Sequence, residues 1–180
     1  MSNRKASEKE KEALEKYLLQ FLNIEKKYPL LPGIDNKDAI AQLIGIETEE
    51  LDKFRELFDE NTKKAAIELL KDEEVSGWID SIPFEPSDKI IAIGDSTTDD
   101  LQGWFSILEH LIQIGLDSDI EFMNAGVSYN TSSEALRRLH QDVLSKDPDW
   151  VIVALGTFDA IRLPIAPERT LVPLSETWEN

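Results

Sequence analysis

The sequence predicts an α/β fold in which a parallel sheet is covered by helices and preceded by an all-helical subdomain. From residue 89 onward, apolar runs alternate strictly with helical patterns, as in parallel βαβ units. From about Ser7 to Asp80, apolar residues recur at helical spacing instead. Between these parts, Pro83 and Pro86 forbid a continuous helix. We therefore expect a helical subdomain at residues 1–86 and an α/β domain at residues 87–180.

The helical subdomain is expected to contain four helices. Prolines at positions 29 and 32 break the chain after the first of them. Asn and Thr are favoured at the start of a helix because their side-chain oxygens accept hydrogen bonds from first-turn N–H groups. The residues that predict the first helix are Leu14, Leu18 and Leu19, and the expected caps of the next three are Asn36, Thr48 and Asn61.

The α/β domain is expected to contain three strands and two full helices. Thr131 and Glu134 have the spacing of a capping box, in which each side chain bonds to the other residue's backbone N–H. Residues 174–180 are typical of the cap and first turn of a further helix. The expected strands are 89–93, 120–123 and 150–155, and the expected helices are 99–114 and 132–145.

With about three strands, the sheet is expected to be incomplete on its C-terminal side. Strand 150–155 would lie at an edge, although its unbroken apolar run is typical of a strand buried on both faces. The following segment contains Pro164, Pro167 and Pro173, and proline donates no hydrogen bond to a neighbouring strand. That segment is therefore not expected to complete the sheet, and self-association through the exposed edge is predicted.

Composition excludes several classes of partner. The formal net charge of -17 opposes binding to nucleic acid and to anionic membranes. The chain has no cysteine, and His110 and His140 are too far apart to form a helical metal pair, so no metal site is expected. Residues 1–12 are polar and lack the apolar stretch of a signal peptide. We expect a cytoplasmic protein without a cofactor.

Three loops follow the three expected strands and contain small and polar residues. They are Gly94–Ser96, Asn124–Ser128 and Gly156–Asp159. The carboxyl ends of parallel strands meet at one edge of a sheet, where ligands bind in open α/β folds. A serine hydroxyl at this edge, beside backbone N–H groups, is placed for nucleophilic chemistry. The sequence therefore predicts one site, with Ser96 at its centre.

These three loops resemble, in order, the first three motif blocks of the SGNH/GDSL hydrolase superfamily of serine esterases. The resemblance covers about residues 89–180 and implies a flavodoxin-like, three-layer α/β/α fold. It implies that Ser96 is the nucleophile and that the N–H groups of Ser96 and Gly126 stabilise the oxyanion. Asp95 and Asp159 lie in the first and third blocks and are further candidate site residues. Each also has a structural interpretation, as a cap or as a residue that stabilises its loop.

Two departures from the family pattern predict impaired activity. The third block ordinarily supplies an Asn side chain as an oxyanion donor, but Phe158 stands at that position and cannot donate. The family's last block, Asp-x-x-His, does not occur, and neither His110 nor His140 has its context. Without a general base, a serine hydroxyl is a weak nucleophile.

The leading hypothesis is a serine ester hydrolase that forms an acyl-enzyme with a small ester, thioester or acetylated substrate. Carboxylates at Asp99 and Asp100, beside Ser96, argue against a phosphorylated substrate. The alternative is a catalytically inactive fragment or pseudoenzyme that serves as a binding or assembly module. A flavodoxin-like nucleotide-binding domain is a third hypothesis, which the lack of a Gly-rich phosphate loop weakens.

Overall fold

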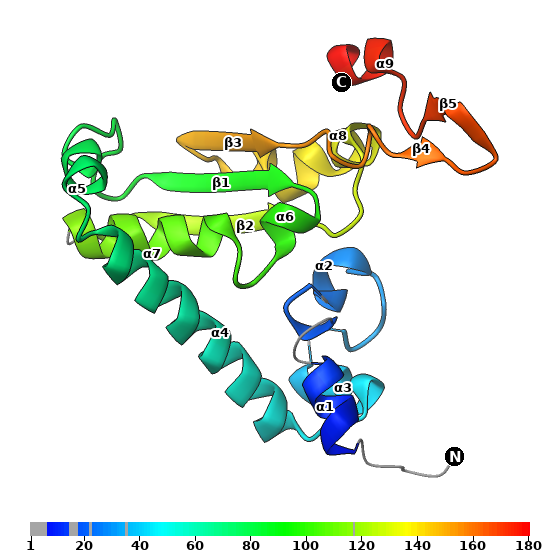
Figure 1. Cartoon of the computed structure of the whole chain (residues 1–180), viewed down its shortest axis with the longest axis horizontal. Coiled ribbons are helices and arrows are strands. Elements are labelled where there is room, and N and C mark those ends of the chain that lie inside the picture. Colours follow the sequence, from blue (N-terminus) through cyan, green and yellow to red (C-terminus); the bar gives the residue numbers. More distant parts are fainter. Residues whose placement is uncertain (1–6, 15–17, 22, 35, 117) are drawn as a thin grey trace.

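The structure, a computed structural model, describes residues 7–14, 18–21, 23–34, 36–116 and 118–180. Figure 1 shows a sheet with its helices, and a helical N-terminal part that reaches the sheet near the carboxyl ends of the strands. The first helix expected from Leu14, Leu18 and Leu19 lies partly outside the described residues; α1 covers Glu8–Leu14. The other helices of this part are α2 (Ile24–Lys27), α3 (Lys37–Ile44), α4 (Thr48–Leu69) and α5 (Glu73–Ile79).

The expected caps of the N-terminal helices have different outcomes. Asn36 caps α3 as predicted, because its side chain accepts a hydrogen bond from the Asp38 N–H. The predicted cap at Thr48 is wrong by one residue: the N-cap of α4 is Glu47, and Thr48 is the first helical residue, whose hydroxyl donates to Asp38 Oδ1 at 2.6 Å. The predicted cap at Asn61 is wrong, because α4 runs straight through this residue. Its buried residues Leu51, Phe58, Thr62 and Ala66 form one stripe at helical spacing, which a break at residue 61 would interrupt.

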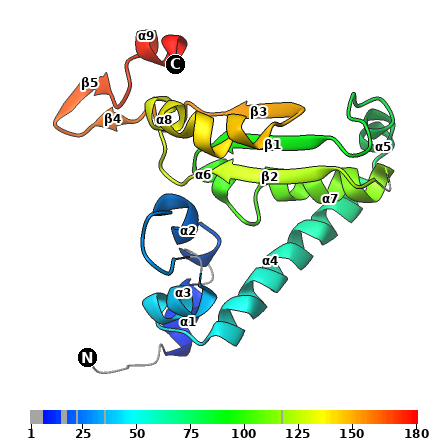
Figure 2. The same ribbon diagram turned by 180° about the vertical axis from the view of Figure 1, so that it is seen from behind.

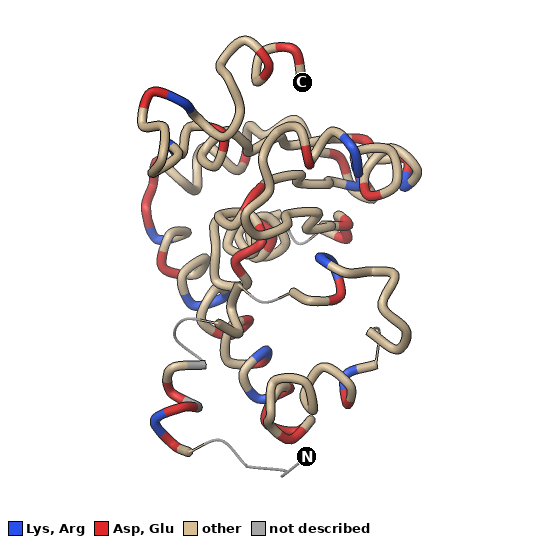
Figure 3. Tube along the Cα trace, turned by 90° about the vertical axis from the view of Figure 1, so that its right-hand side faces the viewer, with Lys and Arg blue, Asp and Glu red and all other residues tan. Residues whose placement is uncertain are grey.

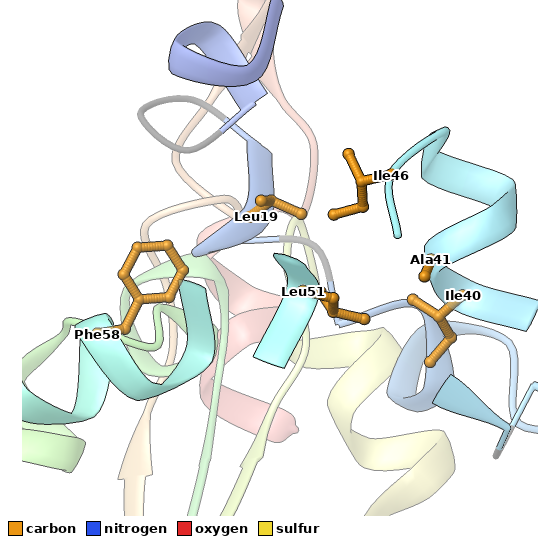
Figure 4. Close-up of a cluster of buried hydrophobic side chains, with 6 residues drawn as sticks. All are labelled: Leu19, Ile40, Ala41, Ile46, Leu51 and Phe58. Atoms are coloured by element: carbon orange, nitrogen blue, oxygen red, sulfur yellow. The ribbon is translucent and has the colours of Figure 1, made fainter. Parts of the chain in front are cut away.

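Two apolar clusters join the N-terminal helices to the rest of the chain. Figure 4 shows the first cluster, formed by side chains from the N-terminal part, and Leu101 of the α/β part packs against it. In the second cluster, Ala66 of α4 and Ile79 of α5 pack against Leu111. The six buried residues of the first cluster are Leu19, Ile40, Ala41, Ile46, Leu51 and Phe58.

The sheet consists of three parallel strands in the order β2-β1-β3. Their bounds are Lys89–Gly94 for β1, Glu121–Gly126 for β2 and Trp150–Ala154 for β3. Gly94, the last residue of β1, pairs with Gly126 on one side and Ala154 on the other. The three motif loops therefore leave the sheet at the same edge.

Helices cover both faces of this sheet (Figures 1 and 2). Successive side chains of a strand point to opposite faces. Ile90 and Ala92 of β1 pack with Phe105 of α7 (Trp104–Leu116), whereas Ile91 and Ile93 pack with Ala135 of α8 (Ser132–Asp142). The predicted α/β class, with three layers and a helical part, is confirmed.

The helix expected at 99–114 is interrupted. A short helix, α6 (Ser96–Asp99), directly follows β1, and a turn separates it from α7. In this turn the Gln102 N–H donates to Asp100 Oδ1 at 2.8 Å. A Cβ atom at Gly103 would lie 2.8 Å from the Thr97 carbonyl oxygen, so the turn packs tightly against α6. The expected helix at 132–145 ends as α8 at Asp142, followed by a single 3-10 turn at Leu144–Lys146.

The segment after β3 forms a hairpin that the sequence did not predict. Strands β4 (Arg162–Leu163) and β5 (Ala166–Thr170) pair with each other and not with the main sheet. The hairpin and helix α9 (Leu174–Glu179) extend beyond the carboxyl end of β3 (Figure 1). The outer edge of β3 carries no strand in the described parts of the chain.

Acidic residues are spread along the whole trace and do not gather on one element (Figure 3). Within the described residues, no helix combines the length and the apolar character needed to cross a membrane.

Candidate active site

Ser96 is the first residue of α6, two residues after the end of β1, and its side chain is half-buried. The preceding residue, Asp95, is only 1% exposed and caps α6. Its Oδ1 accepts hydrogen bonds from the N–H and the hydroxyl of Thr97, both at 3.0 Å. The structure therefore shows that Asp95 caps α6, and its role as a site residue stays a prediction.

The backbone N–H that faces the Ser96 hydroxyl belongs to Tyr129. It donates to Ser96 Oγ at 2.9 Å. Tyr129 has a φ of 68°, a left-handed conformation that residues other than glycine rarely adopt. Such outliers persist only where their surroundings enforce them, and they are frequent at functional sites. Tyr129 lies one residue beyond the second motif loop, Asn124–Ser128, and the motif pattern does not include it.

Aromatic and cationic groups surround Tyr129. Its ring packs edge-on against Phe158, with ring centroids 5.4 Å apart. Lys27 Nζ lies 4.9 Å from the centre of the same ring. Tyr129 directly follows the second motif loop. Its side chain is therefore in contact with both the third motif loop, through Phe158, and the helical N-terminal part, through Lys27.

Gly126 serves close packing between β2 and α6. A Cβ atom there would lie 2.5 Å from the Asp99 nitrogen and 2.7 Å from the Thr98 carbonyl carbon. The Gly126 N–H donates to Asn124 Oδ1 at 2.9 Å and not to Ser96. The oxyanion role of Gly126 stays a prediction, while the N–H that the structure places on Ser96 Oγ is that of Tyr129.

Asp159 ties its loop to two helices. The carboxylate is 3% exposed, and it accepts hydrogen bonds from the Ser132 N–H at 2.8 Å and from the Thr177 hydroxyl at 2.9 Å. Burial by itself raises the pKa of the Asp159 carboxyl, but these hydrogen bonds outweigh it and hold that pKa below its ordinary value. The geometry agrees with the loop-stabilising interpretation of Asp159.

Neither histidine is hydrogen-bonded to Ser96 in the described part of the chain. His110 lies on α7, with Nε2 3.0 Å from Asp59 Oδ1 of α4. His140 is exposed on the last turn of α8. Among the same residues, no group of three acidic, histidine or cysteine side chains is placed to hold a metal ion.

Asp99 has an environment that the sequence did not predict. It is 2% exposed and forms an ion pair with Lys26, whose Nζ lies 3.2 Å from Asp99 Oδ1. Asp100 is half-buried, and burial raises the pKa of its carboxyl. Of these two carboxylates, only that of Asp100 is therefore left to repel a phosphorylated substrate.

A small cavity of about 140 Å³ adjoins Tyr129. Its walls include Asp99 of α6, Ser128 of the second motif loop and residues of the helical N-terminal part, among them Phe21, Ile24 and Tyr28. The helical part therefore shapes the surroundings of the candidate site.

The model of the GDSL-like Lipase/Acylhydrolase family matches residues 92–180. This part of the chain belongs to that family. The match begins within β1 and includes all three motif loops, so the family resemblance inferred from the motifs is confirmed. By this resemblance, the match supports a hydrolase of ester bonds as the general kind of protein. Comparisons with curated proteins and with solved structures found no match.

Proposed function

We propose that this protein is a serine ester hydrolase in which Ser96 forms an acyl-enzyme with a small ester or acetylated substrate. The observation that carries the proposal is the 2.9 Å hydrogen bond from the Tyr129 N–H to Ser96 Oγ. It places a donor within reach of the atom that would bond to the substrate carbonyl, in a segment that belongs to an acylhydrolase family.

In the proposed reaction, Ser96 Oγ attacks the carbonyl carbon of the ester. A tetrahedral oxyanion forms, which the N–H groups of Tyr129 and Ser96 would stabilise by donating to it. The carbon–oxygen bond to the alcohol then breaks, the departing alcohol takes up a proton from water, and an acyl-Ser96 remains. Water hydrolyses this ester, releases the acid and restores the serine hydroxyl.

The proposed turnover is slow. With neither histidine hydrogen-bonded to Ser96 among the described residues, the hydroxyl proton passes to water when Ser96 attacks. Phe158 supplies an aromatic ring where an amide donor would be needed. Donors and binding alone retain roughly 10³- to 10⁴-fold catalysis over water in a serine hydrolase that has lost its triad.

The second candidate function is a catalytically inactive binding or assembly module. The pairing of His110 with Asp59, on helices away from the three motif loops, favours it. The two candidates differ in one respect that can be measured, because only the hydrolase needs a reactive hydroxyl at Ser96.

The test is hydrolysis of a chromogenic acetate ester, together with labelling by a fluorophosphonate probe. We expect slow turnover that Ser96→Ala abolishes and that Ser145→Ala, an exposed serine in the turn after α8, leaves unchanged. Turnover that survives Ser96→Ala would contradict the proposal. The absence of both turnover and labelling would support the binding module. Turnover at a rate usual for enzymes would mean that a histidine acts as base, and His140→Ala would be the next variant to measure.

A further inference from the structure

The carboxylate of Asp99 is held between the helical N-terminal part and the second motif loop. Its Oδ1 accepts from Asn23 Nδ2 at 2.6 Å and from Lys26 Nζ at 3.2 Å. Its Oδ2 accepts from the N–H of Ser128 at 2.9 Å and from the Ser128 hydroxyl at 2.7 Å. Burying a carboxylate is costly unless it is paired and hydrogen-bonded, and here both oxygens are fully used.

This arrangement fixes the residue that precedes the candidate oxyanion donor. Ser128 is bound to Asp99 by both its N–H and its hydroxyl, and the next N–H along the chain is that of Tyr129, which donates to Ser96 Oγ. The left-handed backbone of Tyr129 is unfavourable for a tyrosine and must be enforced by its neighbours. The double anchor on Ser128 is a constraint of this kind.

Asn23 and Lys26 of the helical part supply hydrogen bonds and a positive charge that offset the cost of burying the Asp99 carboxylate. Burial lowers the pKa of Lys26, and the nearby Asp99 carboxylate opposes this effect by favouring the charged ammonium. Lys26 Nζ also lies 3.2 Å from Asn124 Oδ1 of β2. Asn23 Nδ2 contacts the Asp99 backbone oxygen as well, at 2.9 Å. Figure 1 shows α2 next to α6, at the edge of the sheet where the motif loops lie.

We propose that Asn23 and Lys26 of the helical part hold Asp99 in place, and that Asp99 in turn positions the Tyr129 N–H on Ser96. Lys26, Asn23 and Asp99 are positioning residues, since none of them touches Ser96 Oγ. The inference rests on the proposed function for its catalytic consequence, but the geometry of Tyr129 can be measured without catalysis. The helical part then serves the reaction as well as the stability of the fold.

The experiment compares Lys26→Met with Lys64→Met in the full chain. Lys64 is an exposed lysine on α4 that is paired with Glu60, so it controls for the chemical change. The first readout is the NMR resonance of the Tyr129 amide, with Ser96→Ala marking its position when the hydrogen bond to Ser96 is absent. We expect Lys26→Met to shift this resonance toward that position and Lys64→Met to leave it in place.

The second readout is hydrolysis of the acetate ester. We expect Lys26→Met to lower kcat by roughly 10- to 100-fold with little change in KM, because a displaced donor weakens the transition state more than substrate binding. Lys26→Arg, which keeps the charge, should restore part of the rate. If Lys26→Met does not fold, Asn23→Ala removes one donor to Asp99 and should change both readouts in the same direction.

The outcomes separate the two proposals. An unshifted Tyr129 resonance in folded Lys26→Met, with kcat equal to that of Lys64→Met, would overturn the positioning role. Hydrolysis that is insensitive to Ser96→Ala would overturn the proposed function instead. In that case the Tyr129 resonance alone decides the positioning role, because it does not depend on turnover.

Discussion

At the level of single residues, substitution by alanine is expected to change the free energy of unfolding in opposite directions at two glycines of this chain. Alanine at Gly126 would place its Cβ 2.5 Å from the backbone nitrogen of Asp99, so β2 and α6 would have to separate. We expect Gly126→Ala to lower the free energy of unfolding by about 3 kcal/mol.

The Cβ of Gly77→Ala, in α5, meets nothing within 4 Å. It should raise that free energy by about 0.5–1 kcal/mol. Urea denaturation measures both, and wild-type stability of Gly126→Ala would show a looser contact.

The same residues show what could be predicted from the sequence at this scale. The family resemblance assigns the Gly126 N–H to the oxyanion, but it could not reveal that a Cβ at this position would clash with the backbone of α6. Thr131 was recognised correctly because a capping box depends only on residues that are neighbours along the chain. Tyr129 could not be recognised, because its hydrogen bond to Ser96 joins segments that meet only after folding, and no local pattern marks its left-handed φ.

At the scale of elements, local patterns predicted the strands and failed where tertiary packing decides. Each strand was placed within a few residues, since apolar runs bounded by turns are local signals. Asn61 has the chemistry of a cap, but its side chain instead donates to Gln102 Oε1 at 2.9 Å, across to the α/β part. The segment with Pro164, Pro167 and Pro173 does not complete the main sheet, as expected, but the separate pairing of β4 with β5 was not predicted.

The loop that contains Asp159 leads to a prediction about acid stability. Its carboxyl has a lower pKa in the folded chain than in the unfolded chain, so its stabilisation is complete above the unfolded pKa of roughly 3.9. It is then lost as the pH falls through the lower, folded pKa. We expect Asp159→Asn to lower the unfolding free energy by about 1–3 kcal/mol at pH 7, with the difference closing below about pH 4. Thermal melts from pH 3 to 8 measure this. The exposed carboxylate variant Asp80→Asn is the control, and a pH-independent difference would contradict the assignment.

At the scale of the whole molecule, the helical and α/β parts are joined by both apolar and polar contacts. Leu101 packs into the helical cluster, and its N–H donates to the Gln20 carbonyl at 2.9 Å. The ion pair between half-buried Lys26 and buried Asp99 adds a charged link between the same parts. A boundary between residues 86 and 87 is visible in the sequence as a change of pattern, but such a change cannot reveal contacts between segments far apart in the chain. We therefore expect loss of the helical part to affect the candidate site directly.

The exposed edge of the sheet leads to a prediction about association between copies of the chain. The side chains of Val151 and Val153 on β3 are 41% and 68% exposed, and the backbone of an edge strand offers unpaired hydrogen-bonding groups. The net charge of -17 opposes association, and salt screens that repulsion over about 10 Å at 0.1 M. We expect the mass measured by light scattering to rise with protein concentration and more steeply in added salt.

Val153→Lys should suppress the rise because a charge on an edge strand blocks pairing, whereas Ile67→Lys, at an exposed position of α4, should not. A chain that stays monomeric under all these conditions would contradict pairing through β3.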